Sequence, residues 1–200
     1  MSPLSDRLLE SVAAEAVREG LADALYTRVP TAIGDLTVVT GEHGVLRVGF
    51  AEEPEDAVLA GVAGIVGPRV LRSDRELAEV RDALQAYLDG EREADLELPY
   101  DLRLVRSPFR RSVLEALHRD VHRGQTIRYG ELAARAGNPG AARAAGTACA
   151  TNPVPIVVPC HRVLPAGGGV GSYGGGPPRK VALLRLEGAL PSGPASARRS

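Results

Sequence analysis

The chain of 200 residues is long enough for one large domain or two small ones, and for a core that needs no covalent staples. With 44% hydrophobic and 24% charged residues, it has the composition of an ordinary globular protein. Its two cysteines, Cys149 and Cys160, can form at most one bridge, which excludes a disulfide-built scaffold. The longest apolar run, residues 58–66, is too short to cross a bilayer, and the acidic Asp6 and Glu10 argue against a signal peptide. We therefore expect a cytoplasmic protein without a membrane partner.

The net charge of −1 hides an uneven distribution along the chain. Residues 1–100 contain 9 Arg and 20 acidic residues, a net charge of −11, whereas residues 101–200 contain 14 Arg, one Lys and 5 acidic residues, a net charge of +10. A basic half is typical of proteins that bind a polyanion, because each cation that meets a phosphate releases a condensed counterion. A basic surface that only balances the acidic half explains the charge equally well. Charge alone therefore leaves nucleic-acid binding open.

The first half of the chain predicts a small α/β domain, because its apolar residues alternate between helical spacing and short strand-like runs. The expected elements are, in chain order, a helix over residues 4–24, a β-hairpin of residues 36–40 and 45–50 around the turn 41–44, a helix over 54–66, a short strand around Val70 and Leu71, and a helix over 75–89 that ends at Gly90.

The pattern becomes helical in the second half. Ser107 and Pro108 predict the start of a helix, since serine caps helices and proline suits the first helical position. A short helix over residues 129–136 should stop at Gly137, and Asn138 with Pro139 should cap and open the next helix, which runs through 141–146. The helix that begins at Pro108 is expected to bury one face, which consists of Phe109, Val113, Leu114, Leu117 and Val121.

Two short helices joined by a glycine-containing turn are typical of a helix-turn-helix. The second of them is almost entirely alanine and glycine, with Arg143 as its single charged side chain. Such a helix can approach a nucleic-acid groove closely but has few donors with which to read bases. A tightly packed core helix explains the alanines as well, although it does not explain Arg143.

The segment 152–163 carries the strongest chemical signal, because an apolar run bounded by prolines leads to Cys160 with His161 directly after it. A thiol of pKa about 8.5 is mostly protonated at neutral pH, so a nucleophilic cysteine needs a base or a positive environment. Neighbouring side chains of an extended chain point to opposite sides, so His161 would act through a water molecule or after a turn. An inert buried thiol fits the same pair of residues. Two cysteines and four scattered histidines do not suggest a four-ligand zinc site.

The run Pro159-Cys160-His161-Arg162-Val163 resembles the active-site signature of the O6-alkylguanine-DNA alkyltransferases, the methylated-DNA–protein-cysteine methyltransferases. The resemblance is dense over residues 107–188 and loose over the first half. The other matching motifs, in the order and spacing of the family, are Tyr129-Gly130-Glu131-Leu132-Ala133, Gly137-Asn138-Pro139, Ala142-Arg143-Ala144, Asn152-Pro153, Gly171-Ser172-Tyr173-Gly174-Gly175, Lys180, and Leu183-Leu184 followed by Glu187.

The resemblance implies an α+β fold with two domains. A small α/β, RNase H-like N-terminal domain would occupy residues 25–103, and a helical, winged-helix-like domain with the helix-turn-helix would occupy residues 104–190. A helical extension, residues 1–24, and a flexible tail, residues 191–200, lie outside the match. The resemblance further implies a monomer that binds double-stranded DNA containing O6-alkylguanine.

The reaction that the resemblance implies is direct reversal of DNA damage. A guanine flipped out of the duplex from the minor groove enters a pocket, and its O6-alkyl group passes irreversibly to Cys160, so that each protein acts once. His161 would serve as the base and Glu187 would orient it. The remaining implied contacts are Tyr129, Asn152, Pro155, Val163, Tyr173 and Gly174 around the guanine, and Arg143, Arg128, Ala142 and Gly146 toward the DNA.

Several positions depart from the pattern of the family. Arg128 stands where serine is common, Leu114 replaces an expected tryptophan, and Val121-His122 replaces an Ile-Pro turn. Arg128 is therefore a candidate for an additional phosphate contact. The first half contains no cysteine, so the structural zinc of some relatives is not expected, and neither is any other metal or cofactor.

Three other interpretations deserve comparison with alkyl transfer. Residues 169–174 satisfy G-x-G-x-x-G, but no strand precedes them and two prolines follow, so a mobile lid over the guanine is favoured over a dinucleotide site. A protein that binds the lesion without repairing it would not need Cys160. A thiol hydrolase that uses Cys160 and His161 would turn over small esters or peptides and ignore alkylated DNA.

Overall fold

The computed structural model describes residues 3–91 and 93–191, which fold into two compact units. The first unit comprises residues 3–91, 96–106 and 153–157, and the second comprises 93–95, 107–152 and 158–191. The protein has the mixed α and β architecture expected from the sequence. The expected tail, residues 191–200, lies outside the described residues except for Pro191.

A four-stranded sheet of order β3-β2-β1-β4 forms the centre of the first unit. The predicted hairpin is confirmed: β2 and β3 pair antiparallel, with Val38 opposite Val48. The strand β4 was also expected, and it runs parallel to β1 at the other edge. The strands are β1 (Ala24–Val29), β2 (Leu36–Gly41), β3 (Gly44–Phe50) and β4 (Val70–Arg72).

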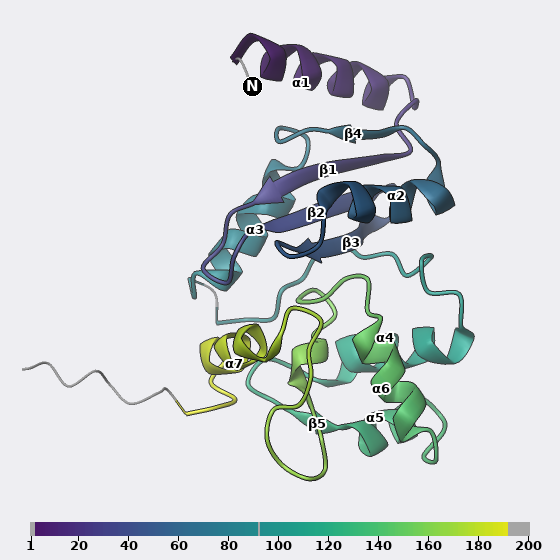
Figure 1. Cartoon of the computed structure of the whole chain (residues 1–200), viewed down its shortest axis with the longest axis vertical. Helices are drawn as coiled ribbons and strands as arrows, with labels where there is room; N and C mark the ends of the chain where they lie inside the picture. Colours follow the sequence, from purple (N-terminus) through teal and green to yellow (C-terminus); the bar gives the residue numbers. More distant parts are fainter. Residues whose placement is uncertain (1–2, 92, 192–200) are drawn as a thin grey trace, which may run out of the picture. The chain divides into compact units, whose positions relative to one another are not determined.

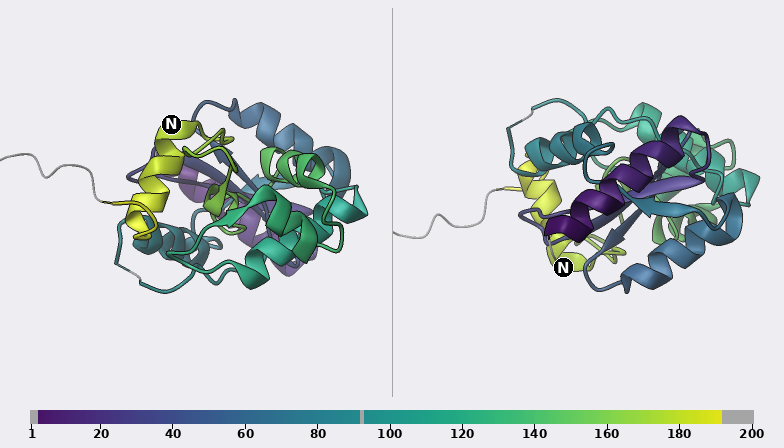
Figure 2. Two further views of the ribbon diagram at one scale, coloured as in Figure 1. Left: turned by 90° about the horizontal axis from the view of Figure 1, so that it is seen from below. Right: turned by 90° about the horizontal axis from the view of Figure 1, so that it is seen from above.

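Two helices cover the sheet on opposite faces, as the views in Figures 1 and 2 show. On one face, the buried Val58 and Val62 of α2 (Glu55–Val66) pack with Val39 and Leu46 of the sheet. On the other face, α3 (Ala78–Leu88) buries Leu84, Tyr87 and Leu88. Both helices lie where the spacing of apolar residues predicts them.

The prediction of one helix over residues 4–24 is wrong at its C-terminal end, and the strand β1 was missed. The helix α1 (Pro3–Arg18) stops before Gly20, which adopts a positive φ of 64° typical of a helix terminus. The chain then enters β1 at Ala24. Leu21 continues the helical spacing of apolar residues by coincidence. The side chains of β1 do not alternate cleanly between buried and exposed. The sequence therefore signalled neither the end of the helix nor the start of the strand.

Helices dominate the second unit. Ser107 caps α4 (Pro108–Asp120) as predicted, because its side chain accepts a hydrogen bond from the backbone N–H of Arg110. The predicted face of α4 is buried at Val113, Leu114 and Leu117, with Val121 after the helix, while Phe109 is half-buried.

The helix-turn-helix arrangement is formed by α5 (Tyr129–Arg135) and α6 (Ala142–Ala150), which pack against each other and against α4. One detail of the prediction is wrong. Asn138 and Pro139 lie in the turn, and α6 begins four residues after Asn138 with no side-chain cap. The helix also continues beyond residue 146, so that Cys149 lies on its last turn.

The remaining elements of the second unit bring the signature run into place. The 3₁₀ helix η1 (Cys160–Arg162) is followed by β6 (Val163–Leu164), which pairs parallel with β5 (Ile127–Arg128). A glycine-rich loop then leads to α7 (Pro177–Leu186). Of the helices that the structure describes, none is long and apolar enough to cross a membrane.

The turn of the hairpin depends on one glycine. Gly44 has a φ of 121°, and a Cβ atom there would lie 2.2 Å from the carbonyl oxygen of Pro99. Gly44→Ala should therefore lower the free energy of unfolding by at least about 2 kcal/mol, measured by urea denaturation.

A matched control is Gly61→Ala in α2, where nothing lies within 4 Å of the added methyl group. It should raise the unfolding free energy by about 0.5–1 kcal/mol, because alanine favours a helix over glycine. Equal effects of the two substitutions would contradict this account of the turn.

Candidate active site

The turn η1 places Cys160 and His161 together in a buried position. Cys160 is 4% exposed and His161 is fully buried. The side chain of Asn152, just after α6, donates from Nδ2 to the carbonyl oxygen of Val158 at 2.8 Å and to Sγ of Cys160 at 3.2 Å. Asn152 therefore ties the end of α6 to the segment that carries the thiol.

His161 is held by a buried carboxylate at the end of α7. Its Nε2 lies 2.7 Å from Oε1 of Glu187, and both side chains are fully buried. Nδ1 of His161 is also buried, and no hydrogen-bond partner for it is present among the residues that the structure describes. With Nε2 committed to the carboxylate, Nδ1 is the atom through which this imidazole can exchange a proton with another group.

Arg162 holds the same carboxylate from its other side. Its Nε donates to Oε2 of Glu187 at 2.8 Å, and its Nη2 donates to Oε1 at 3.2 Å. Although burial raises the pKa of Glu187, the hydrogen bonds from His161 and Arg162 outweigh it and lower this pKa from 4.5 to about 2. Burial, together with the charges of Arg162 and Lys180, lowers the pKa of His161 although Glu187 raises it, so the resting imidazole is neutral at physiological pH and able to accept a proton.

The thiol of Cys160 is protonated at rest, because burial raises its pKa to about 11. Two neighbours oppose this effect of burial and favour the thiolate: the hydrogen bond from Asn152 and the charge of Lys180. Lys180 is fully buried, and its Nζ donates to the carbonyl oxygens of Val163 at 2.7 Å and Ser172 at 3.3 Å. A nucleophile in this position needs a base to remove its proton.

A cavity of about 310 Å³ opens beside Cys160, between α5, α6 and the glycine-rich loop. The ring of Tyr173 stands edge-on to that of His161, with ring centres 6.3 Å apart, and burial raises the pKa of the phenols of both Tyr129 and Tyr173. The cavity is at the small end of the range for ligand pockets. Its lining consists of Tyr129, Gly146, Cys149, Ala150, Cys160, Ser172, Tyr173 and Gly174.

The structure does not bring every expected pocket residue to this cavity. Pro155 is buried in the segment 153–157 of the first unit and does not line it. Val163 lies outside the lining, and its carbonyl oxygen already accepts from Lys180. Asn152 acts on the thiol itself and not on the cavity wall.

The residues expected to meet DNA lie mostly on the surface of the helix-turn-helix. Arg143 is exposed on the first turn of α6, beside the half-buried Ala142, and Gly146 follows one turn later. The exposed Arg128 donates a hydrogen bond to the carbonyl oxygen of Pro165, at the start of the glycine-rich loop. Within residues 3–91 and 93–191, no group of three or more His, Cys, Asp or Glu side chains is arranged to hold a metal ion.

Comparison with known proteins shows which proteins this chain resembles. Residues 108–189 match the family model of the 6-O-methylguanine DNA methyltransferase DNA-binding domain. The crystal structure of the O6-methylguanine methyltransferase of Mycobacterium tuberculosis superposes with a TM-score of 0.70 at 33% sequence identity, covering 85% of this chain and 96% of that one. The chain belongs to the O6-methylguanine methyltransferase family.

Other members of the family show how the likeness is distributed. A methylated-DNA–protein-cysteine methyltransferase of Mycolicibacterium paratuberculosis is 50% identical over 114 residues, which are 56% of this chain and 66% of that protein. One from Salmonella typhimurium is 54% identical over 84 residues, 42% of this chain and 48% of that protein. The sequence matches thus span about half to two thirds of these relatives. The M. tuberculosis OGT crystallised in complex with DNA superposes with a TM-score of 0.68 at 34% identity, covering 82% of this chain and 93% of that one.

Two residues that complete the site of this family member were not assigned a role from the sequence. Arg162 and Lys180 are cations with almost no exposed surface. Arg162 donates to Glu187, and Lys180 donates to the carbonyl oxygen of Val163. Both lie inside motifs that the sequence already singled out. A cation within a strongly apolar run such as residues 153–164 is the signal that could have found Arg162, because a buried charge needs a partner.

We expect Glu187→Ala to lower the free energy of unfolding by about 3–5 kcal/mol at neutral pH, because it leaves the buried charge of Arg162 without this counter-ion. The pKa of Glu187 is depressed in the folded protein, so its stabilising effect is full above pH 4.5 and is lost as the pH falls toward 2. Denaturant unfolding of both proteins from neutral to acidic pH measures the difference.

Glu115→Ala, which removes an exposed carboxylate from α4, is the control and should change the stability by less than about 0.5 kcal/mol. A Glu187→Ala penalty that does not shrink below pH 4.5 would show that the ionised carboxylate is not the stabilising group.

Proposed function

We propose that this protein repairs alkylated DNA by transferring the O6-alkyl group of guanine in duplex DNA to Sγ of its own Cys160. The observation that carries the proposal is the position of Cys160 at the wall of a small cavity. The next residue, His161, is a buried, neutral imidazole paired with the carboxylate of Glu187. A thiol protonated at rest, with a base beside it, is suited to attack on an electrophile that enters the cavity.

The proposed reaction is a single displacement. His161 accepts the thiol proton at Nδ1 through a bridging water molecule, and Glu187 stabilises the imidazolium that results. The thiolate attacks the alkyl carbon, a C–S bond forms as the C–O bond to guanine breaks, and the proton ends on the released guanine. Because the thioether is not readily hydrolysed, each protein molecule acts once and irreversibly.

The cavity supports a flipped purine as the substrate. Tyr129 and Tyr173 offer phenolic donors on opposite segments of its lining, and Gly174 leaves a backbone amide there without a side chain. We assign Tyr129 to the guanine ring and the turning phosphate, and Tyr173 with the amide of Gly174 to O6. The carbonyls of Cys160 and Val163 would accept hydrogen bonds from the exocyclic amine.

The exposed residues of α6 support binding of DNA from the minor groove. Arg143 would occupy the space of the flipped base, while Ala142 and Gly146 let the helix approach closely. Arg128 would add a phosphate contact near the glycine-rich lid. In this proposal the protein is a cytoplasmic monomer, in which a winged-helix-like domain over residues 104–190 follows an RNase H-like domain over residues 25–103.

Mass spectrometry tests the reaction directly. After incubation with excess duplex containing O6-methylguanine, we expect one methyl group per protein, located on Cys160, and none after incubation with unmodified duplex. Cys149 and Cys160 lie on the same tryptic peptide, because no Lys or Arg occurs between Arg143 and Arg162, so fragment-ion sequencing must assign the sulfur.

Cys160→Ser should bind the same duplex but acquire no methyl group. If the wild-type protein binds the lesion and remains unmodified, it recognises damage without transfer. Turnover of small esters or peptides together with indifference to alkylated DNA would favour a thiol hydrolase instead.

Arg143 separates the role of DNA from that of the cavity. Arg143→Ala should slow methyl transfer from duplex DNA by about tenfold or more, because no side chain then fills the space of the flipped base, while transfer from the free O6-alkylguanine base stays unchanged. Arg75→Ala removes an exposed arginine of the first unit and should change neither rate. Equal losses with both substrates would place Arg143 in the chemistry and not in DNA binding.

A further inference from the structure

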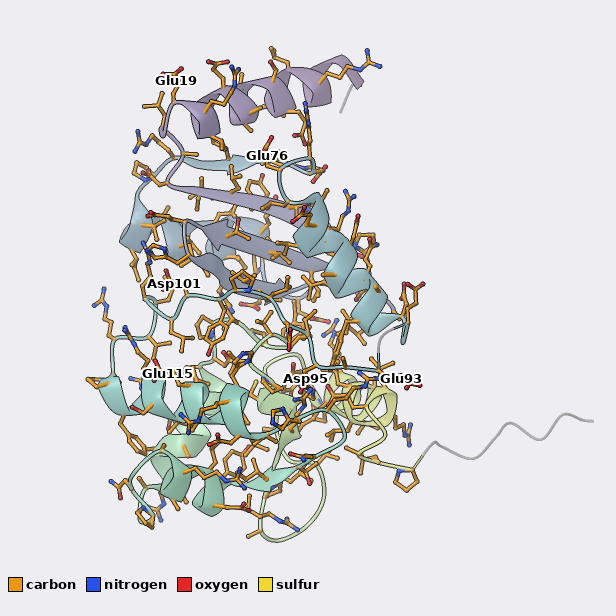
Figure 3. The ribbon with its side chains drawn as sticks, turned by 180° about the vertical axis from the view of Figure 1, so that it is seen from behind. Glu19, Glu76, Glu93, Asp95, Asp101 and Glu115 are labelled. Carbon is orange, nitrogen blue, oxygen red and sulfur yellow. The ribbon has the colours of Figure 1, made fainter. Side chains whose placement is uncertain are left out.

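A second carboxylate, outside the site described so far, takes part in its network of charges. Asp95 lies in the short segment 93–95 of the second unit and is labelled in Figure 3. Its Oδ1 is 2.9 Å from Nη1 of Arg162 and accepts the backbone N–H of Arg123 at 2.8 Å. Its Oδ2 is 2.9 Å from Nδ1 of His122. One carboxylate therefore joins the buried Arg162 to an exposed histidine.

Arg162 is shared between two carboxylates. The side chain is 4% exposed, Nε and Nη2 donate to Glu187, and Nη1 faces Asp95 and also donates to the carbonyl oxygen of Val121 at 2.6 Å. The contacts thus run without a break from His122 through Asp95, Arg162 and Glu187 to His161, all within the second unit.

The balance of charge along this path gives Asp95 a consequence for the base. With Asp95 ionised, part of the charge of Arg162 is balanced by Asp95, so Arg162 neutralises Glu187 less completely. Without the charge of Asp95, Arg162 would neutralise Glu187 alone, and an imidazolium at His161 would gain less from its partner. The negative charge of Asp95 therefore leaves the negative charge of Glu187 available to stabilise a proton on His161.

We propose that Asp95 and His122 are positioning residues that act through Arg162 to set how strongly Glu187 supports His161 during alkyl transfer. This inference rests on the proposed function. A cation at position 122 would take up the charge of Asp95, so that Arg162 would act fully on Glu187 and the base would be weakened.

The other charged groups around Asp95 and His122 include Asp120 and Arg123, which lie close to His122 in the sequence. Asp120 pairs with Arg119, its backbone carbonyl accepts from Arg135, and its carboxylate lies within electrostatic reach of His122. Arg123 donates its backbone N–H to Asp95, and its Nη2 donates to the carbonyl oxygen of Leu186. Asp120 thus has the same charge as Asp95 and lies near the same histidine, but its ion pair is with Arg119, which makes it a matched control.

The test measures single-turnover methyl transfer to Cys160 from saturating O6-methylguanine duplex at neutral pH. Asp95→Asn should slow transfer about three- to tenfold, whereas Asp120→Asn should match the wild type. His122→Arg, which puts a permanent cation beside Asp95, should transfer the methyl group more slowly than the uncharged variant His122→Gln.

The pair should also behave as one unit. Once Asp95→Asn is present, exchanging His122 for Gln or Arg should change the rate no further, because the carboxylate that transmits its charge is gone. Circular dichroism and denaturant unfolding of each variant ensure that only folded protein is compared.

Three results would overturn the inference. Rates of Asp95→Asn and of both His122 variants that equal those of the wild type would show that Arg162 and Glu187 act without them. Equal slowing by Asp95→Asn and Asp120→Asn would show a general effect of surface charge. Absence of methyl transfer by the wild-type protein would overturn the proposed function together with this inference, so the two failures are distinguishable.

Discussion

The second unit depends on one buried carboxylate. Glu187 is an ion with 6% exposure, and removing such an ion from water costs several kcal/mol unless partners replace the solvent. Its two oxygens are matched by His161 and Arg162, two consecutive residues of one short turn. The end of α7 and the turn η1 must therefore stay in register. The same constraint fixes the imidazole beside the thiol, so stability and reactivity share one set of contacts.

Local signals in the sequence were enough for much of the fold. The hairpin, α2 and α3 follow from the spacing of apolar residues and from turn glycines, and Ser107 starts α4 by a bond to the third residue after it. Signals of this kind fail where the spacing typical of a helix continues past a residue that ends it. Leu21 extended the helical spacing of α1 although Gly20 had already ended the helix. The strand β1 was therefore not predicted, although it pairs with both β2 and β4.

The site was predictable only in part, for a related reason. Cys160, His161 and Glu187 were found through their resemblance to a family, and the structure brings His161 and Glu187 to 2.7 Å of each other. No local pattern pairs Asp95 with Arg162, because their contact joins segments that are distant in sequence. A charged residue in a linker and one in a surface salt bridge have the same appearance in a sequence. Only the folded chain shows that Asp95 pairs with the buried Arg162.

The burial of Lys180 has a consequence for the chemistry of the whole surface. It is the single lysine among 24 basic Lys and Arg residues, and its Nζ is enclosed by backbone carbonyls. Arginine and histidine do not form stable amides with acylating reagents. Acetylation, conjugation through an isopeptide bond, and amine-directed biotinylation or crosslinking therefore find no accessible side-chain amine in the folded protein. Attachment of this protein to a surface or a label would have to use a residue type other than lysine.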